Sequence, residues 1–368
     1  MTRVLFIADQ TAASTRTPDA GYPGGAELTD QAAIEACPWP VEVMVTDDVE
    51  PRHLDDFDLH IIGNLGFAKS RASLFNAFHR LGRHILFEHD VRMCLWRGTF
   101  PKSFEYFHRH DHRCVCPHPH LRDLYRSALG TLFLTHRQRE HCRRNPFFEA
   151  PRSLVIGSSL MNEAFFERVE RFREDPPPIE HQMTIAYSSC PRKGYEEALA
   201  YCRRQGVDDP MVIRDLDPPE VLEVLERSKR FVFLPKGLEP GGRMLLEARF
   251  LGCHIVGNRT IGVSGESWWR LDDDQALAVV RDAPHRFWRL VEELRRGAGD
   301  ADDQRTGPSA PTTRRWERAV GPAAVGLMGA AERLLLTAPA FKKMTSRGRR
   351  RRHAPLEVHR TSVKQPSS

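Results

Sequence analysis

An α/β fold of two doubly wound domains is the architecture that the sequence predicts. The chain has 368 residues, enough for two domains of about 150 residues, each with its own core. Short apolar stretches with the length of strands alternate with helical stretches, and this alternation is typical of parallel sheets. A polar, proline-rich break at residues 173–178 separates two such series.

The first series begins directly after Arg3 with a stretch that has the apolar character of a buried strand. Strands are predicted at residues 4–8, 41–45, 59–64, 84–89, 131–135 and 153–156. A polar loop follows the first of them, and Gly24 and Gly25 predict the start of a helix. The first domain is therefore expected to comprise residues 1–172.

The second series has the same rhythm after the proline-rich break. It predicts strands at 183–187, 210–213, 230–234 and 254–257, and helices at 195–204, 218–227, 243–251 and 287–295. The second domain is expected to comprise residues 173–296. Beyond it the composition predicts a flexible linker at 297–315, a helical segment at 316–341 and a disordered basic tail at 342–368.

The positive net charge belongs to that tail. Seven lysines and arginines lie between residues 342 and 353, which contain no acid, so the rest of a chain with net charge +5 is slightly acidic. Such a stretch attracts phosphate-rich partners, which are nucleic acid or an anionic membrane surface. No aromatic residues interleave with it to stack on bases, so a solvated, disordered end is the favoured interpretation.

A reduced, cytoplasmic location is predicted, with peripheral contact to the inner face of a membrane left open. The sequence has no apolar run of the roughly 20 residues that span a bilayer. The opening residues turn acidic at Asp9, too soon for a signal peptide. Eight cysteines are scattered over the chain without the density of a disulfide scaffold.

The strongest chemical signal is the segment from Glu239 to Glu247. It joins a predicted strand to a predicted helix, and ligands of open α/β sheets bind at such carboxyl ends of strands. Gly241 and Gly242 allow close approach of the backbone to a ligand, and the start of the helix is suited to a diphosphate. A carboxylate at Glu247, just over one turn into the helix, can accept hydrogen bonds from the hydroxyls of a ribose, and Glu239 can do so for a second polyol.

This spacing, Glu239 and Glu247 with seven residues between them, resembles the donor-site motif of retaining glycosyltransferases of family 4, which have the GT-B fold. The resemblance implies two Rossmann-like, doubly wound domains that face each other across a cleft. It implies that Glu239 contacts the donor sugar, that Glu247 binds the ribose, and that backbone around Gly241 to Arg243 holds sugar hydroxyls and phosphate. It also implies that the 316–341 segment packs back on the first domain.

Three further matches stand in the family's order. Gly24 and Gly25 resemble the glycine loop that faces the diphosphate. The run from Phe87 to Asp90 resembles the motif that lines the acceptor side, so His89 is a candidate catalytic residue. Lys193, followed by glycine, resembles the lysine that neutralises phosphate.

Two positions depart from the family's pattern. Ser188 stands where family members usually have an arginine, a role that Arg192 could fill. Pro240 stands in place of the glycine that usually follows the first glutamate.

A second kind of chemistry is offered by residues 108–120, where five histidines and two cysteines gather. Both residue types are zinc ligands, but the Cys-x-Cys spacing of Cys114 and Cys116 is not the usual clip, and no second clip follows. A polar acceptor-side loop is the favoured interpretation, and no catalytic metal or other cofactor is expected, because helix N-termini and cations can stabilise a leaving diphosphate.

The sequence as a whole predicts a glycosyltransferase that moves a hexosyl unit from a nucleoside-diphosphate sugar to an acceptor hydroxyl, with retention. The catalytic candidates are His89, Glu239 and Lys193. The donor-binding candidates are Glu247, Gly241, Gly242, Arg243, Arg192, Gly24 and Gly25. The acceptor is a saccharide, a lipid-linked molecule or another hydroxyl compound. The alternatives are a nucleotide-sugar epimerase with the same fold and a transferase that acts on modified nucleic acid.

Overall fold

The computed structural model describes residues 2–12, 22–63, 72–92, 119–145 and 148–302. These residues fall in one compact unit, Met1–Gly307, which contains two parallel sheets. The predicted α/β fold class with two doubly wound sheets is therefore confirmed. The 316–341 segment, the basic tail and all but two residues of the 108–120 stretch lie outside the described residues.

The first sheet has six parallel strands in the order β2-β1-β3-β4-β5-β6. Their bounds are β1 Val4–Ala8, β2 Val41–Val45, β3 Leu59–Ile62, β4 His84–Glu88, β5 Gly130–Phe133 and β6 Ser153–Val155. The chain adds β2 on one side of β1 and then β3 and the later strands on the other side, so the carboxyl ends of β1 and β3 flank a topological switch point.

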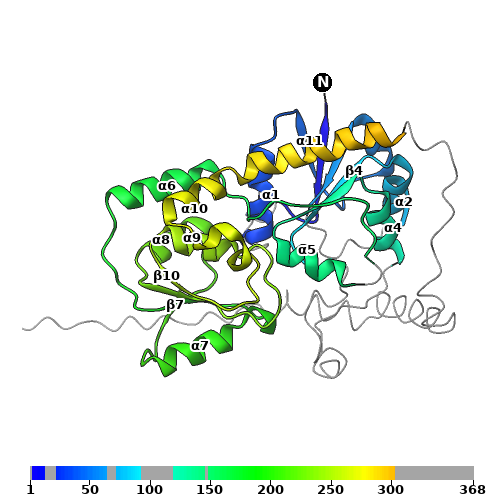
Figure 1. Ribbon diagram of the computed structural model, residues 1–368. Helices are drawn as coiled ribbons and strands as arrows, with labels where there is room; N and C mark the ends of the chain where they lie inside the picture. The colour runs from blue at the N-terminus through cyan, green and yellow to red at the C-terminus, as the bar shows by residue number, and fades with distance from the viewer. Residues whose placement is uncertain (1, 13–21, 64–71, 93–118, 146–147, 303–368) are drawn as a thin grey trace, which may run out of the picture. The chain divides into compact units, whose positions relative to one another are not determined.

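Helices cover both faces of this sheet (Figure 1). They are α1 Gly25–Glu35, α2 Ala72–Leu81, α4 Pro119–Ser127, α5 His136–Arg143 and α11 Ala283–Asp302, with a 3-10 helix, η1, at Pro51–Asp56. Apolar residues of α1 and α11 share one core cluster with β1, β3, β4 and β5. On the other face, Phe78 of α2 packs on the ring of His84, and Tyr125 of α4 reaches Glu88.

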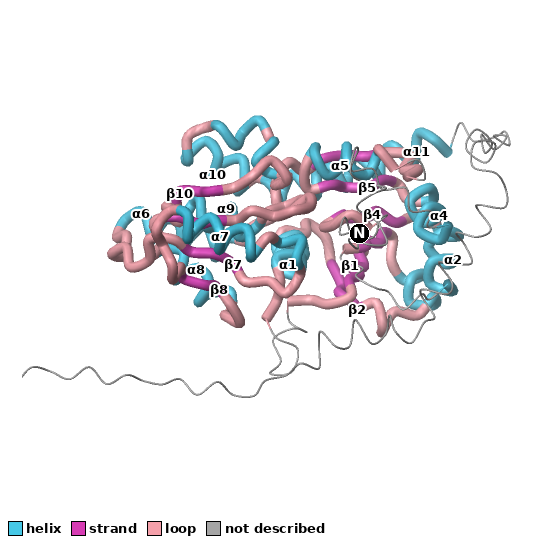
Figure 2. The backbone as a smooth tube through the Cα atoms, turned by 90° about the horizontal axis from the view of Figure 1, so that it is seen from below, coloured by secondary structure: helices cyan, strands magenta, loops and turns pink. Residues whose placement is uncertain are grey.

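The second sheet has four parallel strands in the order β10-β9-β7-β8. Their bounds are β7 Thr184–Ala186, β8 Met211–Ile213, β9 Arg230–Val232 and β10 His254–Val256. Its helices are α6 Glu163–Glu174, α7 Tyr195–Arg204, α8 Pro218–Glu226, α9 Arg243–Phe250 and α10 Asp273–Arg281, with 3-10 helices η3 Pro191–Lys193, η4 Val263–Gly265 and η5 Ser267–Arg270. Residues of α6, α8, α9 and α10 share one core cluster, and α7 covers the opposite face. Figure 2 shows β10, β7 and β8 in one group, and β5, β4, β1 and β2 in the other.

Two helices pack away from the domain to which the predicted boundaries assigned them. Phe165, Phe166 and Val169 of α6 lie in the core cluster of the second sheet, although most of α6 precedes residue 173. Phe287 and Trp288 of α11 lie in the cluster of the first sheet, although they precede residue 296. Each half of the chain thus contributes one helix to the sheet of the other half. A boundary placed at a proline-rich loop does not reveal this exchange.

The predicted linker at 297–315 begins too early, because α11 continues to Asp302. The linker is predicted from a composition of glycine, aspartate, proline, serine and threonine with few apolar residues. In the part that is helical, Gly297 and Gly299 each cost the helix only about 1 kcal/mol relative to alanine. Extending an existing helix needs no new nucleation, so the alanines and the preceding turns of α11 carry it further. Among the described residues, no helix is long and apolar enough to cross a membrane.

Candidate functional site

The loops that follow β7 and β9 meet at the switch point of the second sheet. Lys193 lies in η3 after β7, and Glu239 lies after β9. The Lys193 Nζ atom is 2.6 Å from Glu239 Oε2. The structure therefore joins two of the three predicted catalytic residues in one ion pair at the carboxyl edge of the sheet, where ligands of such folds bind.

Backbone geometry fixes these two loops against each other. Gly194 follows η3 with φ of 71°, and a Cβ atom there would lie 1.9 Å from the carbonyl oxygen of Leu234. The N–H of Lys236 donates to the carbonyl of Arg192 at 2.8 Å. Only glycine fits at position 194, so the lysine-glycine pair in the sequence reflects tight contact between the strand ends.

Glu247 and Arg243 form a second ion pair on the first turns of α9. Arg243 Nε donates to Glu247 Oε1 at 2.9 Å, and both side chains are 9% exposed. The other end of the guanidinium, Nη1, donates to the carbonyl of Leu160 at 2.6 Å. A Cβ atom on Gly25 would lie 3.5 Å from Arg243 Cβ, so the glycine loop that starts α1 borders the same arginine. Gly25 thus lies against the arginine side chain that holds the predicted ribose-binding glutamate.

Gly241 and Gly242 are glycines for two separate reasons. Gly242 is the N-cap residue of α9 with φ of 55°, and no side chain caps the helix. At Gly241, a Cβ atom would lie 2.2 Å from Ser159 Oγ and 2.8 Å from Leu134 Cδ1. The missing side chain at Gly241 therefore makes room for packing against the first sheet's loops, a requirement that exists without any ligand.

Arg192, the candidate for the missing family arginine, is held by Asp90 from the first sheet. Its Nη1 and Nη2 atoms donate to the two carboxylate oxygens of Asp90 at 2.9 and 3.3 Å. Burial by itself lowers the pKa of Arg192, but the adjacent carboxylates of Asp90 and Glu239 raise it above its ordinary value. A permanent positive charge thus lies between the end of β4 and the Lys193–Glu239 pair.

His89, the third predicted catalytic residue, is buried at the end of β4 and paired with Asp30 of α1. Its neighbour Glu88 accepts a hydrogen bond from the Tyr125 hydroxyl and lies 3.2 Å from Arg92 Nε. Burial, together with the Glu88 carboxylate, raises the pKa of Tyr125 well above its ordinary value. The run that the sequence assigned to the acceptor side thus distributes its polar side chains over both faces of the sheet.

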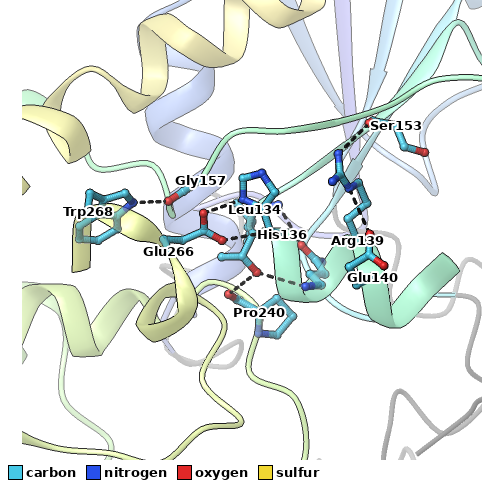
Figure 3. A network of polar contacts seen from close by, with 11 residues as sticks. Leu134, His136, Arg139, Glu140, Ser153, Gly157, Pro240, Glu266 and Trp268 are labelled. Carbon is cyan, nitrogen blue, oxygen red and sulfur yellow. Dashed lines mark hydrogen bonds and ion pairs between the residues drawn. The ribbon is translucent and has the colours of Figure 1, made fainter. Parts of the chain in front are cut away.

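A further polar network joins the ends of β5 and β6 to the loops after β9 and β10 (Figure 3). The buried carboxylate of Glu266 accepts from the backbone N–H of His136 at 2.8 Å and lies 2.8 Å from His136 Nδ1. Trp268 Nε1 donates to the carbonyl of Gly157 at 2.7 Å. Thr135, the N-cap residue of α5, donates from Oγ1 to the Pro240 carbonyl at 3.3 Å. The Thr135 contact ties the loop that carries Glu239 to the first sheet, and the Glu266 and Trp268 contacts tie the segment after β10 to it.

Sequence reasoning did not single out Asp30 or Glu266, although both carboxylates are buried. Asp30 lies six residues after Gly24, between Thr29 and Gln31, with Glu27 one turn earlier, so its local sequence does not mark it as a buried acid. Glu266 lies in a loop and has no local signal at all. Among the described residues, no group of three or more histidines, cysteines and acids could hold a metal ion.

Comparison with known proteins gives structural similarity without sequence similarity. No protein-family model matches the chain, and no curated protein sequence does. Anabaena Alr3699/HepE in complex with UDP and glucose is 14% identical over 82% of this chain and 100% of its own, with a TM-score of 0.48. Sucrose-phosphate synthase from Thermosynechococcus elongatus is 11% identical over 83% and 99%, with a TM-score of 0.46. An α-glucosyltransferase in complex with UDP and a 13-mer DNA is 11% identical over 80% and 90%, with a TM-score of 0.45.

Proposed function

We propose that the chain is a glycosyltransferase that moves a hexosyl unit from a nucleoside-diphosphate sugar to a hydroxyl group of an acceptor, with retention of configuration. One observation carries the proposal. Two glutamates, each paired with a cation, lie at the carboxyl edge of the second sheet, on the loop and helix that follow β9. In a nucleoside-diphosphate sugar, cations can pair with the phosphates, and carboxylates can accept hydrogen bonds from the hydroxyls of the ribose and of the sugar.

Glu247 is the proposed ribose ligand. Arg243 engages Oε1 of Glu247 and fixes the carboxylate, and the remaining oxygen can accept hydrogen bonds from the vicinal hydroxyls of a ribose. The arginine is itself tied to the Leu160 carbonyl, so the glutamate is oriented before the nucleotide arrives.

Lys193 and the N-terminus of α9 are the proposed diphosphate ligands. The lysine side chain is 36% exposed and can turn from Glu239 to a phosphate oxygen, which leaves the Glu239 carboxylate to hydroxyls of the donor sugar. Gly242, the N-cap residue of the helix, provides no side-chain cap, which suits the free backbone N–H groups to an anion. Arg192 adds positive charge beside them, while Gly24 and Gly25 face the diphosphate from the first sheet.

Isothermal titration with UDP and GDP tests the nucleotide site. We expect one of the two nucleotides to bind, and Glu247→Ala to weaken that binding by about 10- to 100-fold, because hydrogen bonds to a charged group contribute about 1.5–3 kcal/mol. Glu226→Ala is the matched control. Glu226 also pairs with an arginine, Arg168, but it ends α8 and lies before β9, at the opposite edge of the sheet.

No binding of either nucleotide at millimolar concentration would refute the proposal, as would equal losses in the two glutamate variants. A hydrolysis screen across UDP-, GDP- and ADP-sugars then identifies the donor. Incubation with UDP-N-acetylglucosamine in the absence of acceptor separates transfer from epimerisation. Slow release of free sugar agrees with a transferase. Formation of an epimerised nucleotide sugar would instead support the epimerase alternative.

A further inference from the structure

His89 and Asp30 form a buried pair at the carboxyl edge of the first sheet. The imidazole Nε2 atom lies 2.6 Å from Asp30 Oδ1, and the side chains are 4% and 3% exposed. The two residues come from different elements, His89 from the end of β4 and Asp30 from the middle of α1. A buried carboxylate that accepts a hydrogen bond from one ring nitrogen sets the tautomer and the orientation of the imidazole.

The surrounding residues hold this geometry in place. The ring of Phe87 lies against the His89 ring, with 4.2 Å between centroids. Gly63, directly after β3, leaves room for the Asp30 carboxylate, because a Cβ atom at position 63 would lie 2.9 Å from each of its oxygens. The missing side chain at Gly63 therefore leaves space at the strand end for the Asp30 carboxylate and for the Phe6 ring, which such a Cβ atom would approach to 2.8 Å.

The second ring nitrogen of His89 makes no hydrogen bond with the residues that the structure describes. This nitrogen, Nδ1, is buried. Leaving such a group unsatisfied costs about 1–3 kcal/mol. His60 and His84 also have an unsatisfied Nδ1, but their Nε2 atoms lie near backbone carbonyls inside the sheet core. His89 differs in having a carboxylate partner and in lying where the strand ends.

We propose that Asp30 is a positioning residue, which fixes the His89 ring so that Nδ1 accepts a hydrogen bond from a hydroxyl group of the saccharide substrate. With the Nε2–H donated to Asp30, Nδ1 carries the lone pair of the imidazole and requires a donor. A sugar hydroxyl is such a donor, and a carbonyl or a phosphate oxygen is not. The inference rests on the proposed function, and it assigns a role to an acid that the sequence did not single out.

Nitrogen-15 NMR of the histidine rings tests the geometry without any turnover. The His89 signals are identified by their loss in His89→Phe. We expect the wild-type ring to show a single Nε2–H tautomer, and Asp30→Ala to show exchange between both tautomers. Asp30→Asn retains an oxygen that accepts the Nε2–H and should keep the wild-type tautomer. An unchanged His89 spectrum in Asp30→Ala would overturn the proposal.

Kinetics with the donor found in the hydrolysis screen tests the role. Displacement of a positioned group costs on the order of 100-fold, so we expect Asp30→Ala to lower kcat/KM by about that factor and Asp30→Asn to restore most of it. In a His89→Phe background, Asp30→Ala should change kcat/KM by less than about twofold, because the two residues act as one unit. Glu35→Ala, an exposed acid on the same helix, is the control and should leave kcat/KM unchanged.

The outcomes separate this inference from the proposed function. If the wild type binds no nucleotide and hydrolyses no donor, the proposed function fails, and the tautomer spectra still decide whether Asp30 sets the ring. If turnover is present but Asp30→Ala lowers kcat/KM equally with and without His89, Asp30 acts only through the fold and the inference is wrong. Thermal melting of each variant distinguishes lost activity from lost structure.

Discussion

Gly241, which the sequence predicts to allow close approach of a ligand, packs against side chains of the first sheet's loops. Ser159 Oγ and Leu134 Cδ1 occupy the space that a side chain at position 241 would need, and both belong to segments that follow strands of the first sheet. Its neighbour Gly242 is required by its positive φ instead. Adjacent glycines in one motif thus meet a packing requirement and a backbone requirement, and neither identifies a ligand.

Gly241→Ala is expected to destabilise the protein by about 1–3 kcal/mol, the usual cost of overpacking. Adding Ser159→Ala should restore part of the loss, because it removes the hydroxyl in contact with the new methyl group. Urea unfolding measures the two free energies, and titration with the nucleotide measures binding in the same variants. Absence of any recovery in the double variant would show that the steric explanation is wrong.

At the scale of an element, the N-terminus of α5 is capped by two side chains, one local and one distant in sequence. The Thr135 side chain accepts a hydrogen bond from the N–H of Gln138, and Glu266, distant in sequence, accepts from the N–H of His136. A carboxylate at this end of a helix satisfies a free N–H and interacts favourably with the helix dipole. The Glu266 contact therefore satisfies a free N–H of α5 and also attaches the loop after β10 to the first sheet.

Glu266→Ala should lower the free energy of unfolding by about 1–3 kcal/mol, because it removes the charged acceptor of the partly buried His136 N–H. Glu140→Ala, on the exposed side of the same helix, should change it by less than about 0.5 kcal/mol. Hydrogen exchange at the first turn of α5 should quicken only in the former variant. Equal protection in both variants would contradict a capping role for Glu266.

At the scale of the whole molecule, the two sheets share helices and polar contacts. Helix α6 leaves the first sheet to pack on the second, and α11 returns from the second to pack on the first. Arg192 and Asp90 add an ion pair between them. The described residues accordingly fall in one compact unit, and loss of one sheet is expected to expose the core of the other.

Acid should therefore unfold both sheets together. Burial lowers the pKa of His84, within the first sheet, to about 4 from an ordinary value of 6.5, so folding favours its neutral form. This stability is complete above pH 6.5 and is lost as the pH falls towards 4, by up to about 3 kcal/mol. Urea unfolding at several pH values measures the slope, which should become shallower in His84→Leu. Hydrogen exchange that increases in β4 but not in β7 at pH 5 would contradict coupled unfolding.

The sequence by itself determined the order of the elements, the parallel α/β class, and the loop and helix that carry Glu239 and Glu247. These features follow from local periodicity and from residues close together in the chain, so a pattern can predict them. The tertiary structure alone decided which sheet α6 and α11 cover, why Gly241 has no side chain, and which partners hold His89 and Arg192. The acids that hold these two residues, Asp30 and Asp90, lie 59 and 102 positions away. No local pattern encodes such pairings, because they arise only when the packed helices and strand ends bring distant residues within hydrogen-bonding distance.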